Sequence, residues 1–189
     1  MSLPGKKRRR RLIRMDIIYD ADILDPLAIE GNRLPSEVRR YTLKLAEKLT
    51  EQIAPEIAED DKVLFVFILR GAMLLYPRFA EKFESASFTF VTAGTFTALD
   101  CTDYDIVVIV DTVVDTGKTV AMAKKLLMDS GISAKRWFCG CVFAKASVKA
   151  KITEYIDRFF CLVAPEEIKK YIDAGKYAAC GDGAQITAE

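Results

Sequence analysis

The residues best suited to carry out chemistry are those from Asp111 to Thr119. They follow a run of β-branched apolar residues, Ile106–Val110, which predicts a buried strand. The five residues Asp115–Thr119 then lead into a helical pattern. A strand that turns through Asp-Thr-Gly into a helix presents backbone N–H groups and hydroxyls at the positive end of the helix dipole. The pattern therefore predicts an anion cradle suited to phosphate, with Asp111 placed to hold sugar hydroxyls or a metal.

A second candidate anion site lies at Arg70-Gly71, after an apolar run over Lys62–Leu69 that predicts another buried strand. Glycine lets the backbone approach a ligand closely, and the arginine fork can grip two oxygens. Alone, this pair would fit an ordinary turn between a strand and a helix. Combined with the first segment, it predicts two anion sites on neighbouring strand ends.

The obvious competing interpretation of the first segment is an ATP-binding P-loop, Gly-x-x-x-x-Gly-Lys-Ser/Thr. The position of its first glycine is Thr112 here, which lacks the same backbone freedom. The segment instead resembles the phosphoribosyl-pyrophosphate (PRPP) loop of type I phosphoribosyltransferases. In that family a hydrophobic strand leads to one or two acids, two apolar residues and then Asp/Ala-Thr-Gly-x-Ser/Thr. The resemblance covers about Lys62 to Gln185. The remaining alternative for the first segment is a turn between a strand and a helix that binds no ligand.

The resemblance implies a nucleobase phosphoribosyltransferase of nucleotide salvage, which moves 5-phosphoribosyl from PRPP to a base and releases pyrophosphate. The pyrophosphate would bind to Arg70 and Gly71. Asp111 would bind the ribose hydroxyls, directly or through Mg²⁺, the one cofactor implied. The resemblance makes Asp115 and Asp111 the catalytic candidates, with Asp115 as the one candidate general base. The chain has no histidine, so any acid–base work must fall to Asp, Glu, Lys or Tyr. The 5′-phosphate would be held by Asp115, Thr116, Gly117, Lys118 and Thr119.

Evidence on the base is divided. A C-terminal segment resembles the uracil-reading Tyr-x-x-Pro-Gly-x-Gly-Asp of uracil phosphoribosyltransferases, although Cys180 replaces the proline and the acid precedes the second glycine. Its base-binding candidates are Tyr177, Ala178, Gly181, Asp182 and Gly183. Asp115 is typical of the hypoxanthine-guanine enzymes, whereas the single acid at Asp111-Thr112 is typical of the uracil class. The lysine that reads purines ahead of the last predicted strand is replaced by Ile156 in the best local match.

We therefore expect uracil slightly ahead of hypoxanthine or guanine. A different class of function is a regulator of the same fold that senses PRPP and binds RNA through the basic run Lys6–Arg11. The departures at Thr112 and in the C-terminal segment keep that alternative open.

The elements that must position these residues alternate along the chain. Apolar runs predict strands at 62–69, 88–91, 105–111, 136–144 and 158–164, and helices are expected at 36–57, 72–83, 117–130, 147–156 and 165–173. Ser36 is the expected N-cap of the first helix, Pro55 should kink or end it, and Gly131 should cap the third. The alternation predicts an α/β fold with a doubly wound parallel sheet, like that of type I phosphoribosyltransferases, in a single domain with a small hood.

Domain limits and setting follow from composition. Residues 1–15 are expected to form a basic, disordered tail and residues 16–189 the phosphoribosyltransferase domain. The segment Thr92–Tyr104 is either a mobile lid or an ordinary crossover loop. A net charge of +1 offers no general nucleic-acid signal, and no apolar run reaches membrane-spanning length.

The five cysteines form no paired framework, which fits a reducing, cytoplasmic compartment. Cys139, Cys141 and Cys161 fall in apolar strand patterns, so they are expected to be small buried hydrophobes. The partners implied by the resemblance are PRPP, a nucleobase and further copies of the chain in a homodimer or larger assembly.

Overall fold

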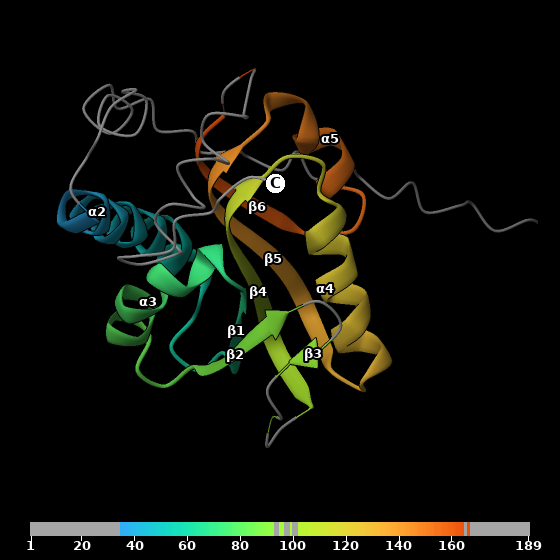
Figure 1. The fold of residues 1–189 in the computed structure, drawn as a ribbon. Coiled ribbons are helices and arrows are strands. Elements are labelled where there is room, and N and C mark those ends of the chain that lie inside the picture. Colours follow the sequence, from blue (N-terminus) through green and yellow to red (C-terminus); the bar gives the residue numbers. More distant parts are fainter. Residues whose placement is uncertain (1–34, 93–94, 97–98, 100–101, 165, 167–189) are drawn as a thin grey trace, which may run out of the picture.

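A six-stranded sheet forms the centre of the molecule (Figure 1). The computed structural model describes residues 35–92, 95–96, 99, 102–164 and 166. The strands lie in the order β3-β2-β1-β4-β5-β6. Their bounds are β1 Val63–Ile68, β2 Ser87–Thr92, β3 Thr95–Phe96, β4 Asp103–Val114, β5 Ser133–Ala144 and β6 Arg158–Val163. All neighbouring pairs are parallel except β2 and β3, which run antiparallel.

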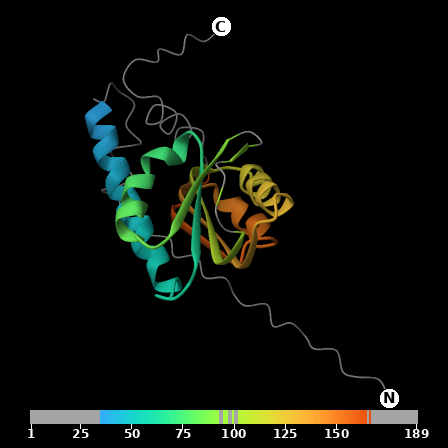
Figure 2. The ribbon, with the colours of Figure 1, turned by 90° about the horizontal axis from the view of Figure 1, so that it is seen from below.

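Helices cover both faces of the sheet, with α2 and α3 on one side and α4 and α5 on the other (Figures 1 and 2). Their bounds are α2 Pro35–Ile53, α3 Tyr76–Lys82, α4 Lys118–Asp129 and α5 Lys149–Ile152, with short 3₁₀ turns at Ala54–Glu56, Gly71–Leu74 and Ala146–Val148. This arrangement confirms the predicted doubly wound α/β fold.

The apolar strand runs are explained by burial on two faces. Every residue of β1 is buried, because its alternate side chains enter two different cores. Phe65 and Phe67 pack with α2 and α3, whereas Leu64 and Val66 pack with α4 and α5. A parallel sheet covered on both sides therefore reads in the sequence as an unbroken apolar run rather than an alternating one.

The helix α4 directly follows the first candidate site, and it ends as predicted at Gly131. That glycine has a φ of 88°, and its N–H donates to the carbonyl of Met128 at 3.0 Å. The N–H of Ile132 donates to the carbonyl of Leu127, also at 3.0 Å. These two bonds satisfy the last carbonyls of the helix. Buried Val120, Ala123 and Leu127 fix α4 against the sheet, so its first turn is held in a defined place.

Several predicted boundaries differ from the structure. β4 continues through Val114, so Asp111 lies within the strand and not at its end. The helix expected over 72–83 is divided into a 3₁₀ turn and a shorter α3, with Pro77 in the first turn of α3. The first helix begins at Pro35, one residue before the expected N-cap Ser36, and its α-helical part ends at Ile53, just before Pro55. An end of this helix at Pro55 was predicted, since proline cannot donate the next helical hydrogen bond.

Other expectations fall on residues that the structure does not describe. They are the basic tail, the helix over 165–173 apart from residue 166, residues 93–94, 97–98 and 100–101 of the segment Thr92–Tyr104, and the C-terminal segment with Tyr177, Ala178, Gly181, Asp182 and Gly183. Within the described residues, no helix is both long and apolar enough to cross a membrane.

Candidate functional site at the carboxyl edge of the sheet

The strand order marks one place on the sheet as the expected ligand site. From β1 the chain moves outward to β2 on one side, whereas β4, β5 and β6 extend the sheet on the other side. Strand order therefore reverses between β1 and β4, and ligands of open α/β sheets bind beside the carboxyl ends of the strands at such a reversal. Arg70 follows β1 and Asp115 follows β4. The topology thus selects the same two segments that the residue types selected.

The loop between β4 and α4 has the geometry of an anion site. Gly117 adopts a left-handed conformation with φ of 76°, and α4 begins at the next residue. A side chain at Gly117 would be strained by that φ, which favours glycine. Asp115, Thr116, Lys118 and Thr119 are all exposed around it. The first N–H groups of a twelve-residue helix therefore open to solvent beside two hydroxyls and an ammonium, which suits an anion.

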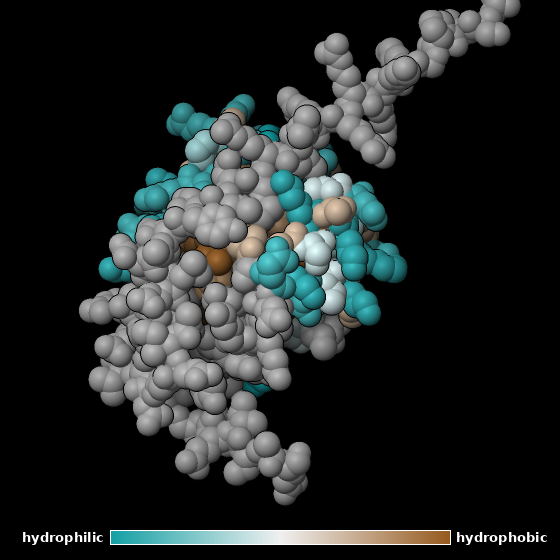
Figure 3. Space-filling model, turned by 90° about the horizontal axis from the view of Figure 1, so that it is seen from above, coloured by the Kyte–Doolittle hydropathy of each residue, from teal (hydrophilic) through white to brown (hydrophobic). Residues whose placement is uncertain are grey.

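Figure 3 looks down on this edge, and hydrophilic side chains gather there over the side of α4 and α5.

The loop after β1 lies in direct contact with the end of β4. A Cβ added at Gly71 would stand only 2.4 Å from Oγ1 of Thr112, a distance that real Cβ atoms do not reach. Only glycine allows this approach. Arg70, directly before it, is exposed, and the peptide between Leu69 and Arg70 is cis. Residues 41 positions apart in the sequence, 112 less 71, are thereby brought together.

Asp111 lies between these two loops, on the part of β4 that pairs with Cys141 of β5. Burial raises the pKa of its carboxyl to about 7, against a smaller lowering by the N–H groups of Thr112 and Val113. The N–H of Thr112 donates to Oδ1 of Asp111 at 2.7 Å. A carboxyl whose pKa is close to 7 loses its proton and becomes charged when a cation approaches. Asp111 can therefore receive hydroxyls or a metal ion without being fixed in an internal ion pair.

The donor set at this place suits Mg²⁺ bound together with a substrate. In the described part of the chain, no group of three or more acidic, cysteine or histidine side chains could hold a metal alone. Mg²⁺ usually keeps several waters and binds through one or two carboxylates and the phosphates of its substrate. The single carboxyl of Asp111 between two anion-suited loops meets that description.

The thiols of Cys139 and Cys141, near Asp111, contribute no reactive group. Cys139, Cys141 and Cys161 are free and completely buried, as the sequence predicted. Burial is the main reason that the pKa values of Cys139 and Cys141 are raised well above the usual range. Thiols that stay protonated are neither good nucleophiles nor metal ligands.

Two residues at this edge were missed by the sequence analysis. Lys145 follows the end of β5, its backbone N–H donates to the carbonyl of Val114 at 3.0 Å, and its side chain is exposed. The purine-reading lysine was sought ahead of β6, at Ile156, which is instead buried in the core. Tyr155 contacts the β4–α4 loop through its hydroxyl, which donates to the carbonyl of Gly117 at 2.9 Å. The end of the strand at Ala144 could have pointed to Lys145, whereas no local pattern points to Tyr155.

The fold is that of an α/β protein, with two loops that suit anions at the reversal point of its sheet. No family model matches the chain, and no curated protein matches it. It superposes on the AQ2163 protein from Aquifex aeolicus with a TM-score of 0.58 and 16% identity, over 76% of this chain and 81% of that one. At this identity, the two proteins share their fold.

Two further matches carry activities in their names. A hypoxanthine phosphoribosyltransferase from Staphylococcus aureus matches with a TM-score of 0.49 and 15% identity, over 74% of this chain and 79% of that one. A xanthine-guanine-hypoxanthine phosphoribosyltransferase from Helicobacter pylori matches with a TM-score of 0.45 and 22% identity, over 68% and 85%.

Proposed function

We propose that this protein binds PRPP and transfers its 5-phosphoribosyl group to a nucleobase, releasing pyrophosphate. The observation that carries the proposal is the contact between Gly71 and Thr112. It joins two anion-suited loops at the reversal point of the sheet, and PRPP has two anionic groups on one ribose. A ligand with a single phosphate would need only the β4–α4 loop.

Each half of the site has a task in this reaction. The N–H groups and hydroxyls of Asp115–Thr119 would hold the 5′-phosphate, and Arg70 with the backbone at Gly71 would hold the pyrophosphate. Asp111 would orient the ribose hydroxyls and hold Mg²⁺, which supplies charge neutralisation for the leaving group. The bond from the anomeric carbon to pyrophosphate oxygen breaks, and a bond to a base nitrogen forms. The protein contributes mainly position and electrostatics.

The proton that the attacking base loses needs an acceptor. Asp115 is exposed beside the first turn of α4, and within the described residues its carboxylate has no hydrogen-bond or ion-pair partner. We therefore assign Asp115 as the general base. The acid at position 115, which is typical of the hypoxanthine-guanine enzymes, and the exposed Lys145 at the neighbouring strand end together favour a purine. This moves purines ahead of the uracil that the C-terminal segment suggested.

The deciding experiment measures pyrophosphate release from PRPP and Mg²⁺ with hypoxanthine, guanine, xanthine and uracil in turn. Release with a purine supports the proposal as stated, and release with uracil alone would restore the original preference. Arg70→Gln should raise the KM for PRPP. Arg78→Gln is the matched control, since Arg78 already pairs with Glu81 at 2.6 Å. PRPP binding without release for any base would contradict transfer and leave a sensing role.

A further inference from the structure

The hydroxyl of Tyr155 reaches the anion-suited loop from a different part of the chain. Tyr155 lies in the turn after α5, where its N–H donates to the carbonyl of Ile152 at 3.1 Å. Its hydroxyl donates to the carbonyl of Gly117 at 2.9 Å, across 38 residues of sequence. The same carbonyl also accepts the N–H of Ala121 at 3.0 Å, the first turn of α4. Both lone pairs of the Gly117 carbonyl are therefore engaged.

This contact sets the direction of a peptide plane at the site. The carbonyl of Gly117 and the N–H of Lys118 belong to one rigid, planar unit, in which they point in opposite directions. Two donors hold the carbonyl toward the protein. The N–H of Lys118 consequently points away from the protein body and into the exposed side of the loop. There it has only a weak contact with Oγ1 of Thr116, at 3.4 Å, so it remains available to an anion.

The turn that carries Tyr155 also shapes the loop by contact. A Cβ at Gly117 would stand 2.9 Å from the Tyr155 hydroxyl oxygen, 3.1 Å from Cγ1 of Ile152 and 3.5 Å from Cγ2 of Val148. The left-handed glycine thus lies against a wall made by α5 and its flanking turns. Val148 and Ile152 are buried in the core, so this wall is anchored by packing.

Tyr155 is held at its other end as well. Nζ of Lys124, on α4, donates to the backbone carbonyl of Tyr155 at 2.6 Å. The same ammonium lies 4.8 Å from the centre of the Trp137 ring, a favourable cation–π distance. Asp157, two residues after Tyr155, holds Trp137 in place, because the backbone N–H of Trp137 donates to its carboxylate at 2.7 Å. Burial raises the pKa of the Tyr155 phenol to about 12, so the hydroxyl keeps the proton that it donates.

We propose that Tyr155 is a positioning residue for phosphate binding: its hydroxyl holds the Gly117 carbonyl and so aims the Lys118 N–H at the 5′-phosphate. The inference rests on the proposed function and names a residue that the sequence did not assign to the site. Tyr155 touches no substrate, so its effect passes entirely through the loop. It belongs to the β4–α4 half alone and should leave the Arg70 half unaffected.

The test compares Tyr155→Phe with the parent protein and with Tyr76→Phe. The first removes one hydroxyl and keeps the ring. Tyr76 is a matched control because it packs edge-on among Phe67, Phe88 and Phe90 in the core on the α2 and α3 side. Ribose 5-phosphate binding by calorimetry supplies a readout that does not depend on turnover. We expect Tyr155→Phe to weaken this binding on the order of tenfold, the usual scale for one lost hydrogen bond.

Three further readouts separate positioning from a general loss of structure. Pyrophosphate binding should change less than twofold in Tyr155→Phe, because it uses the other loop. The KM for PRPP should rise while kcat changes little, and the amide resonances of Gly117 and Lys118 should shift. Equal weakening of ribose 5-phosphate and pyrophosphate would overturn the inference, as would unchanged ribose 5-phosphate affinity. If the parent protein binds ribose 5-phosphate but transfers nothing, the proposed transfer fails and the role of Tyr155 is still decided. If the parent protein binds no ribose 5-phosphate at all, both fail.

Discussion

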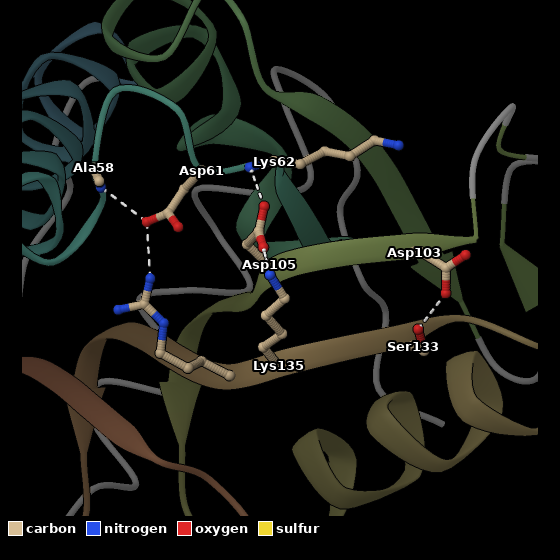
Figure 4. Close-up of polar contacts among 8 residues, drawn as sticks. Ala58, Asp61, Lys62, Asp103, Asp105, Ser133 and Lys135 are labelled. Atoms are coloured by element: carbon tan, nitrogen blue, oxygen red, sulfur yellow. Dashed lines mark hydrogen bonds and ion pairs between the residues drawn. The ribbon is translucent and has the colours of Figure 1, made fainter.

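Two aspartates of β4, one near each edge of the sheet, lie under opposite conditions. At the amino edge of the sheet, Asp105 accepts the N–H of Lys62 at 2.8 Å and pairs with Nζ of Lys135 at 2.6 Å (Figure 4). The hydrogen bond from Lys135 is the largest cause of its lowered pKa. At the carboxyl edge, burial raises the pKa of Asp111 to about 7. One strand therefore holds one carboxylate that is matched by a cation and another that is not.

The contrast extends beyond these two residues. At the amino edge, Asp61 also pairs with Arg136 at 2.8 Å, and Asp103 accepts a hydrogen bond from Ser133 (Figure 4). At the carboxyl edge, Arg70, Asp115 and Lys118 are exposed, and within the described residues their side chains have no ion-pair partner. Charges that pair internally stabilise the fold. Charges left without a partner around a left-handed glycine are available to a ligand, and this difference supports the proposal that the ligand binds at the carboxyl edge.

The largest expected effect comes from removing the unmatched charge with Asp111→Asn. The raised pKa means that the folded protein resists ionisation, so the carboxyl destabilises the fold progressively as pH rises from about 4 to about 7. Asp111→Asn should therefore be more stable than the parent at pH 8, by up to about 4 kcal/mol, and equally stable near pH 4. Urea unfolding across this range measures the difference, with exposed Asp115→Asn as control.

The same variant should lose turnover more than it loses phosphate affinity. Asp111 is assigned to the ribose and metal, whereas the phosphate is assigned to the loop. Equal loss of both would contradict that division. If Asp111→Asn is no more stable than the parent at high pH, the pKa of the Asp111 carboxyl is not raised in the folded protein.

Gly71→Ala should have the next largest effect, because it breaks the contact between the two halves of the site. The new Cβ would meet Oγ1 of Thr112 at 2.4 Å, and overpacking of this kind costs roughly 1–3 kcal/mol. We expect PRPP turnover to fall on the order of a hundredfold, as measured by pyrophosphate release. Gly71→Ala/Thr112→Ala removes the clashing oxygen and leaves Cβ of residue 112 at 3.6 Å. After correction for the effect of Thr112→Ala alone, turnover by the double variant should be at least about tenfold higher than turnover by Gly71→Ala. No recovery of turnover would refute the steric coupling.

The smallest expected effect lies at the amino edge. Because the pKa of Asp105 is lowered, its stabilising contribution is present above about pH 4 and disappears as pH falls below that. Asp105→Asn should lower the melting temperature slightly at pH 7, show a progressively smaller difference as pH falls below about 4, and leave the KM for PRPP unchanged. Lys125→Ala is the matched control, since Lys125 and its partner Asp129 have side chains 75% and 60% exposed and such pairs contribute little. A changed KM in Asp105→Asn would mean that the two edges are not independent.

Much of the fold could be predicted because its strands and helix ends produce local patterns in the sequence. The apolar runs around Val66 and Val108 marked buried strands, and Gly131 marked the end of α4. The two-residue strand β3 was not predicted, since Thr95–Phe96 is too short to show a period. The helix after Gly71 was predicted as continuous, because the preference for a 3₁₀ turn there depends on how the chain leaves β1 and not on propensity alone.

The sequence by itself determined which residues could bind anions: a glycine before a helix at Gly117, and a cation before a glycine at Arg70. Residue type and spacing are enough for that, because backbone freedom and helix dipoles are local properties. Only the tertiary structure decided that β1 lies beside β4 and that Gly71 therefore touches Thr112. It alone also raised the pKa of Asp111 by burial and brought the Tyr155 hydroxyl to Gly117. Strand order, desolvation and contacts across 38 residues arise from packing of distant segments, which no local pattern encodes.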